Sequence, residues 1–125
     1  MKEIIQTDNA PAPIGPYSQA VKSGNMLFVS GQVAFIPGTT ELQLEDIVKE
    51  TNQVMSNIAA ILTKAGMDFS NIVKTSIFLK DMNDFVTVNE AYGKFFRGNY
   101  PARETIQVSR LPKEVNVEIS VIAMS

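Results

Sequence analysis

The longest periodic pattern in the chain is helical, and it constrains the fold more than any other feature. Between residues 45 and 65, mostly apolar side chains recur at steps of three and four, as on an amphipathic helix of about six turns: Ile47, Val48, Thr51, Val54, Met55, Ile58, Ile61, Leu62 and Ala65. Gly66 follows and suits the left-handed residue that ends many helices. A helix with one apolar stripe has to bury it against another layer, which the remaining residues must supply.

Strand patterns on both sides of this helix predict that second layer. Two-residue alternation or β-prone composition marks six segments: 4–7, 17–22, 26–30, 72–80, 103–109 and 115–123. Gly24-Asn25 forms a turn that joins two of them as a hairpin, and Asp81 is suited to cap a second helix. The order predicts a single α+β domain over residues 1–125, with two helices on one face of a mixed sheet.

The other face of the predicted sheet is neither polar nor apolar. Its residues are too apolar for open water and too polar for a closed core: Met26, Phe28, Ser30, Lys74, Ser76, Phe78, Asn116, Glu118, Ser120 and Ile122. A partner subunit would resolve this conflict, so we expect the chain to form an oligomer.

Composition excludes several classes of function. The 125 residues carry a net charge of -2, and the lysines and arginines are scattered, so no basic surface for nucleic acid or an anionic membrane is predicted. Without cysteine or histidine, catalysis has to rest on carboxylates, hydroxyls, arginine, amides and backbone groups. No apolar run resembles a signal peptide or approaches the ~20 residues of a membrane span, and we expect a cytoplasmic protein.

Arg103 and Glu118, on the last two predicted strands, are the candidates for chemistry. Strand alternation places Arg103 and Thr105 on one face of their strand, and Glu118 on the polar face of the next one. Arg103 can grip a carboxylate, while a glutamate held in a strand can shuttle a proton or orient water. A structural ion pair of Arg103 with Glu104 or Glu118 is an equally good interpretation, and the residues alone leave both open.

Five further residues are weaker candidates. Tyr17 follows a rigid Gly-Pro pair that either aims it into a site or places it over the core edge, and Asn89 at a helix edge is more typical of a solvent-facing residue. Ser30 has no histidine to activate it and can only donate or accept a hydrogen bond, while Gly31 indicates a turn or bulge. The backbone N–H of Thr105 could bind the same anion as Arg103. Neither a phosphate loop nor metal-ligand spacing is present, so no cofactor and no metal are predicted.

Several motifs together resemble the RidA/YjgF family of reactive-intermediate (enamine/imine) deaminases over nearly the whole chain. They lie at residues 12–20 (APIGPYSQA), 27–32 (LFVSGQ), 89–92 (NEAY), 100–103 (YPAR), 111–112 (LP) and 117–119 (VEI). The resemblance implies a chorismate-mutase-like α+β fold that assembles as a homotrimer with three clefts between subunits. It also implies hydrolysis of 2-aminoacrylate, 2-iminopropanoate, 2-iminobutanoate and related imines of amino-acid metabolism to 2-keto acids and ammonia.

The resemblance also assigns roles to single residues. Arg103 would bind the substrate carboxylate, Glu118 would position or activate water, and four residues would line the cleft: Tyr17, Ser30, Gly31 and Asn89. Two positions depart from the family pattern, because Thr105 replaces a frequent cysteine and Glu104 replaces a small residue.

Two other functions compete with the deaminase. A non-catalytic carrier or sensor would bind keto acids or amino acids in the same cleft and would need Arg103 equally. Some relatives are called endoribonuclease or translation inhibitor, but an acidic chain without a histidine pair is a poor candidate for RNA cleavage.

Overall fold

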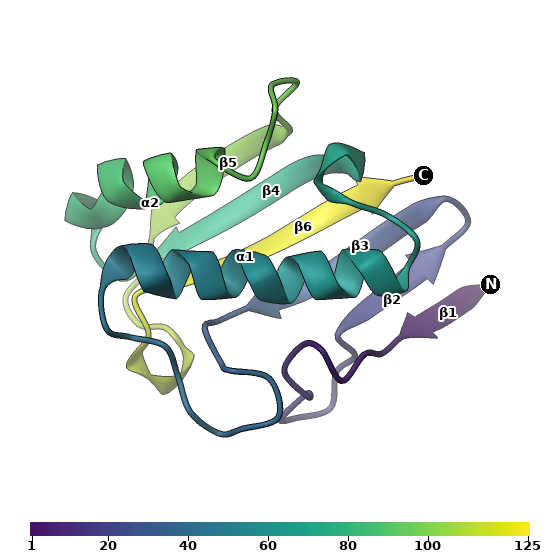
Figure 1. The fold of residues 1–125 in the computed structure, drawn as a ribbon, viewed down its shortest axis with the longest axis horizontal. Helices are drawn as coiled ribbons and strands as arrows, with labels where there is room; N and C mark the ends of the chain where they lie inside the picture. The colour runs from purple at the N-terminus through teal and green to yellow at the C-terminus, as the bar shows by residue number, and fades with distance from the viewer.

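Helix α1, Ile47–Lys64, lies along one face of a six-stranded sheet in the computed structural model, which describes residues 1–125 (Figure 1). Asp46 caps the helix by accepting a hydrogen bond from the backbone N of Lys49 at 2.8 Å, and Gly66, with φ of 74°, follows its end. Most of the predicted stripe is confirmed, because Val54, Met55, Ile58, Ile61 and Leu62 are all fully buried, but Val48 in the first turn is exposed. No helix is long and apolar enough to cross a membrane.

The sheet is mixed, as predicted. Its strands, in the order β1-β2-β3-β6-β4-β5, are β1 (Lys2–Ile5), β2 (Ala20–Ser23), β3 (Met26–Gln32), β6 (Val117–Met124), β4 (Ile72–Leu79) and β5 (Ala102–Gln107). All neighbours are antiparallel except β4 and β5, which are parallel. A parallel pair needs a crossover, and helix α2, Phe85–Gly93, supplies it between β4 and β5.

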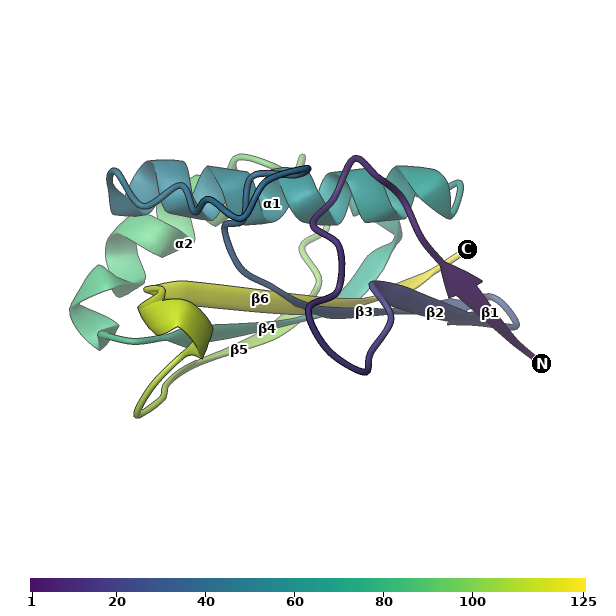
Figure 2. The ribbon, with the colours of Figure 1, turned by 90° about the horizontal axis from the view of Figure 1, so that it is seen from below.

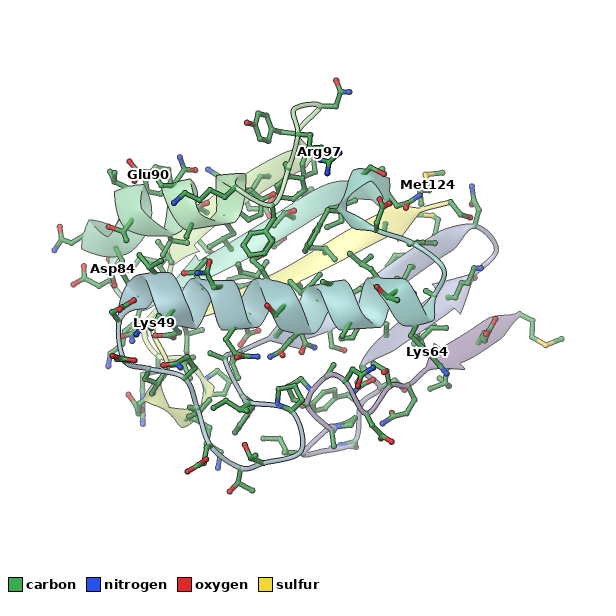
Figure 3. The ribbon with its side chains drawn as sticks, in the orientation of Figure 1. Lys49, Lys64, Asp84, Glu90, Arg97 and Met124 are labelled. Carbon is green, nitrogen blue, oxygen red and sulfur yellow. The ribbon has the colours of Figure 1, made fainter.

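The core lies between the two helices and one face of the sheet (Figure 2). Strand β6 shows the alternation clearly, because Val117, Ile119, Val121 and Ala123 are buried while the residues between them are only half-buried. Charged side chains such as Lys49, Lys64 and Glu90 occupy the outer, exposed side of the helices (Figure 3).

No helix covers the opposite face of the sheet, which we call the open face (Figure 2). Cross-strand pairs bring the predicted mixture together there, with Phe28 opposite Ile122 and Phe78 opposite Glu118. Phe28 is 42% exposed and Ile106 is 45% exposed. The expectation of one covered and one mixed face is therefore confirmed.

Candidate functional site

Arg103 lies on β5, on the side of the sheet that α2 covers. Its register partner on β4 is the buried Thr75. The guanidinium carbon of Arg103 is 5.2 Å from the ring centroid of Tyr92 and 5.8 Å from that of Phe85, so two aromatic faces of α2 attract the cation. The Tyr92 hydroxyl donates to Oγ1 of Thr75 at 2.9 Å, which fixes its ring, and burial raises the Tyr92 pKa.

The ion-pair interpretation of Arg103 is wrong for this chain. Glu104 pairs instead with Lys74 at 2.9 Å and accepts a hydrogen bond from Ser76, and that hydrogen bond is the main reason that the Glu104 pKa is lowered. None of the ion pairs involves Arg103 or Glu118. The Arg103 guanidinium is therefore left with donors for an external carboxylate.

A hollow of about 620 Å³ opens beside Arg103. Seven residues of α2, the following loop and β5 line it: Asn89, Glu90, Tyr92, Gly93, Tyr100, Pro101 and Arg103. The structure thus brings Asn89 and Arg103 together. Thr105 lies on the same side of β5 but is not among these residues, and its Oγ1 is buried without a hydrogen-bond partner.

Glu118 lies on the open face, in a second and smaller hollow of about 70 Å³ that Tyr17 and Gly31 also line. It forms no ion pair and no side-chain hydrogen bond, and burial raises its pKa above the ordinary value of 4.5. Gly31 sits in the irregular stretch between Val29 and Gln32, where a bulge was predicted. A Cβ at Gly31 would collide with the Glu118 carboxylate, so any larger residue there would force that side chain to move.

Tyr17 lines this second hollow, whereas Ser30 on β3 does not. Residues 17–19 were expected in a strand, but β2 begins at Ala20, and Tyr17 stays in the loop with its side chain 49% exposed. Ser30 donates from its hydroxyl to the carbonyl of Ser18 at 2.6 Å and lines neither hollow. Its role as a ligand residue remains a prediction.

Buried polar side chains that the sequence reasoning missed hold the loops around Glu118. The Gln19 amide accepts from the backbone N of Thr7 at 2.8 Å and donates to three carbonyls of residues 7–11. Asn57 of α1 donates to the carbonyls of Val33 at 3.2 Å and Phe35 at 3.0 Å. The signal for Asn57 was present in the sequence, because an amide inside an apolar helical stripe needs a buried partner.

The structure separates the two charged candidates instead of bringing them together. We expected Arg103 and Glu118 on neighbouring strands, but β4 lies between β5 and β6. Arg103 points to the helix side, whereas Glu118 pairs with Phe78 on the open face. One chain therefore carries two candidate half-sites, which we call the Arg103 half-site and the Glu118 half-site, on opposite faces of its sheet.

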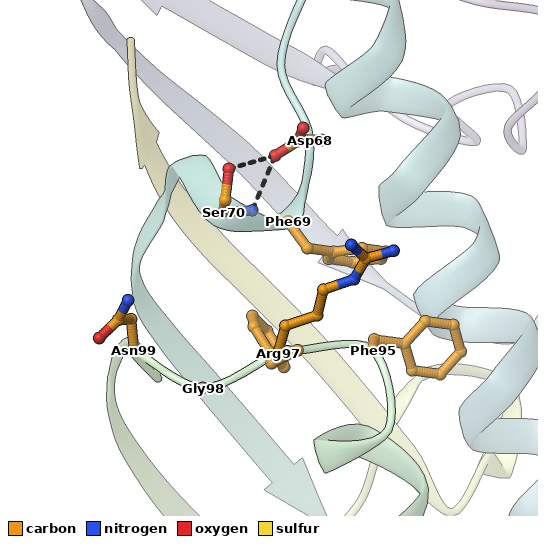
Figure 4. A pocket seen from close by; sticks show the side chains of 8 residues that line it. Asp68, Phe69, Ser70, Phe95, Arg97, Gly98 and Asn99 are labelled. Atoms are coloured by element: carbon orange, nitrogen blue, oxygen red, sulfur yellow. Dashed lines mark hydrogen bonds between the residues drawn. The ribbon is translucent and has the colours of Figure 1, made fainter.

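A third hollow, of about 560 Å³, contains none of the predicted residues (Figure 4). It lies between residues 68–70 and the loop after α2, with Phe69, Phe95 and Arg97 in its wall. Asp68 is already engaged there, since it accepts hydrogen bonds from the backbone N and the hydroxyl of Ser70, and these lower its pKa.

Comparison with known proteins places the chain in a family. The family model described as Endoribonuclease L-PSP matches residues 7–125. A RutC family protein of Pyrococcus horikoshii is 52% identical over 98% of both chains, and the chloroplastic Reactive Intermediate Deaminase A of Arabidopsis thaliana is 47% identical over 98% of this chain and 65% of its own length. The solved structure of Escherichia coli TdcF with bound serine is 42% identical, covers 98% of each chain and has a TM-score of 0.94. The chain therefore belongs to the RidA/YjgF family.

Proposed function

We propose that the protein is an imine and enamine deaminase that hydrolyses 2-imino acids to 2-keto acids and ammonia. The observation that carries this proposal is that Arg103 and Glu118 are both left without a charged partner. An unpaired guanidinium suits the substrate carboxylate, and a half-buried carboxyl whose pKa is raised by burial suits proton transfer. The Arabidopsis relative is named a reactive-intermediate deaminase, which supports the proposal.

The chemistry needs only these two groups and water. A protonated imine is electrophilic at C2, so water adds there while Glu118 accepts one of its protons. The proton then passes to the nitrogen of the 2-amino-2-hydroxy acid, the C–N bond breaks, ammonia leaves, and loss of the hydroxyl proton gives the keto acid. Arg103 holds the carboxylate so that C2 faces the water. An enamine first takes a proton at C3 to become the imine.

The proposal requires two subunits for each site. Because Arg103 and Glu118 lie on opposite faces of one sheet, a complete site needs the Arg103 half-site of one copy against the Glu118 half-site of the next. The half-apolar open face gives a surface for that contact, and the family resemblance implies a homotrimer. Thr105 would complete the carboxylate site with its backbone N–H, and Tyr17, Ser30, Gly31 and Asn89 would line the cleft.

A non-catalytic binding protein is the second candidate. The structure of TdcF with bound serine favours it, because serine is an amino acid that has the same carboxylate but no imine. The family model's endoribonuclease description is less well supported for this chain, which has a net charge of -2 and no histidine.

A coupled assay tests the proposal. A pyridoxal-phosphate-dependent dehydratase generates imines from serine or threonine, and keto-acid release is followed with and without the protein. We expect Arg103→Ala to abolish the acceleration through lost binding, and Glu118→Gln to abolish it while 2-keto acid binding persists. Arg110→Ala serves as the control, because Arg110 is exposed, pairs with Glu114 and lines neither hollow. Undiminished turnover by Arg103→Ala would contradict the proposal, and wild-type binding without turnover would favour the binding protein.

A further inference from the structure

Glu50 has a buried carboxylate whose hydrogen-bond partners all lie outside its own helix. Glu50 lies in the first turn of α1, is 0% exposed and forms no ion pair. Its Oε2 accepts from the backbone N of Asn116 at 2.8 Å and of Val117 at 3.2 Å, and its Oε1 accepts from Nδ2 of Asn116 at 2.7 Å. Three donors satisfy the buried charge, and all three come from the residues that lead into β6.

Strand β6 has no β3 partner at this end. Its pairing with β3 becomes irregular after Val29, and the last pair joins Gln32 to Ile119, two residues short of Val117. On the other side, the pairing with β4 continues through Glu118 to Val117, and the carbonyl of Asn116 accepts from the backbone N of Lys80 at 3.0 Å. Glu50 and the β4 ladder therefore fix together the point where β6 enters the sheet.

Glu118 is the next residue after Val117, and its carboxylate packs closely against Gly31. Its carboxylate lies so close to Gly31 that even a methyl group there would collide with it. A displacement of β6 along its own axis would press the carboxylate into the Gly31 backbone or withdraw it from the hollow. The position of β6 thus decides where the Glu118 carboxylate stands.

We propose that Glu50 is a positioning residue for Glu118, which acts by hydrogen-bonding Asn116 and Val117 and so setting the start of β6. The catalytic consequence rests on the function proposed above. In this proposal the length of the Glu50 side chain is what counts, because an oxygen at its end must accept from two backbone N–H groups. Its negative charge is not required.

Two substitutions separate the effect of side-chain length at position 50 from the effect of its charge. Glu50→Asp keeps the charge but is one methylene shorter, so its oxygens retreat from Asn116 and Val117. Glu50→Gln loses the charge but keeps a carbonyl oxygen at full reach, and the Asn116 amide can rotate to offer its oxygen to the new NH₂ group. We expect kcat to fall about ten- to a hundredfold in Glu50→Asp with KM little changed, and to stay near wild type in Glu50→Gln.

A neighbouring substitution controls for general damage to the helix. Thr51 is also fully buried, but its hydroxyl donates only to the carbonyl of Ile47 in the same helix, at 2.8 Å. Thr51→Val should lower the melting temperature without lowering kcat. The proposal is overturned if Glu50→Gln loses kcat while Glu50→Asp keeps it, if both keep it, or if the loss only follows the fall in melting temperature. Should Glu50→Asp fail to fold, Asn116→Ala takes its place, with a smaller fall in kcat expected.

A readout independent of turnover distinguishes failure of this proposal from failure of the proposed function. In NMR spectra, Glu50→Gln should leave the amide protons of Asn116 and Val117 and the carboxyl ¹³C resonance of Glu118 near their wild-type positions. Glu50→Asp should shift all three. If the wild type does not hydrolyse imines, these shifts still decide the role of Glu50, and an unmoved Glu118 resonance in Glu50→Asp overturns it.

Discussion

Glu118 and Arg103 are both ionisable side chains without an ionic partner, yet their surroundings in the fold differ. Arg103 rests against the rings of Tyr92 and Phe85, which stabilise its cation. Glu118 is half-buried and accepts no hydrogen bond, so burial raises its pKa. A carboxylate kept in such a position lowers stability, and perturbed groups of this kind are typical of functional sites.

We expect Glu118→Gln to raise the melting temperature at neutral pH. Because the folded chain raises the Glu118 pKa above 4.5, the stability that this residue contributes is fully present below 4.5 and is lost as pH rises through the raised pKa. Glutamine carries no charge at any pH and avoids that loss. Calorimetry across pH measures the effect, and the advantage of the variant should shrink as the solution is made acidic. An advantage that is the same at all pH values, or also seen in the exposed control Glu41→Gln, would contradict the expectation.

At the scale of elements, α2 and β5 form the Arg103 half-site together. The crossover from β4 through α2 to β5 brings two aromatic residues of the helix over a strand that follows it in sequence. The hydroxyl of Tyr92 also donates a hydrogen bond to Thr75 on β4. The ring of Tyr92 and its hydroxyl therefore do different things: the ring attracts Arg103, and the hydroxyl satisfies a buried group.

Two substitutions of Tyr92 should separate these contributions. Tyr92→Leu removes the ring, and we expect KM to rise about tenfold because Arg103 loses a cation–π partner. Tyr92→Phe keeps the ring but leaves Oγ1 of Thr75 buried without its partner, which costs about 1 kcal/mol of stability and leaves KM near wild type. Steady-state kinetics and chemical denaturation measure the two effects. Equal KM values in both variants would show that the ring does not hold Arg103.

Local patterns predicted the elements well and their pairing less well. The helix expected over 45–65 spans Ile47–Lys64, although Val48 of its predicted stripe is 40% exposed in the first turn. Strand alternation correctly put Arg103 and Thr105 on one face of β5. It could not show that this face is the opposite one from Glu118, because that depends on β4 lying between the two strands. Alternation is a property of one strand, whereas relative facing is a property of the whole sheet.

The candidate site shows the same limit. Arg103 and Glu118 could be named as candidates from residue type and position, and the mixed sheet face led to the expectation of a partner subunit. The contacts of Glu50, Gln19 and Asn57 join segments that are far apart in sequence, so only the folded chain reveals their partners. Gly31 was read as a turn or bulge residue, and its close approach to Glu118 required the register of β3 and β6.

At the scale of the whole molecule, the separated half-sites make assembly part of the proposed chemistry. Each copy offers Arg103 on one side of its sheet and Glu118 on the other. In a closed ring of copies, every contact between neighbours then joins unlike half-sites, and all sites are equivalent. Loss of assembly should therefore abolish turnover even when both residues are intact.

Mixing two inactive variants tests this arrangement directly. Arg103→Ala and Glu118→Gln should each be inactive alone, since every cleft lacks one group. After joint unfolding and refolding at equal amounts, roughly a quarter of the clefts pair an intact Arg103 with an intact Glu118 from the neighbouring copy, if subunits combine at random. Keto-acid release should recover to about that fraction of wild type, while mixing without subunit exchange should restore nothing. If both groups served a site within one chain, no mixture would recover activity, because no single chain in it carries both.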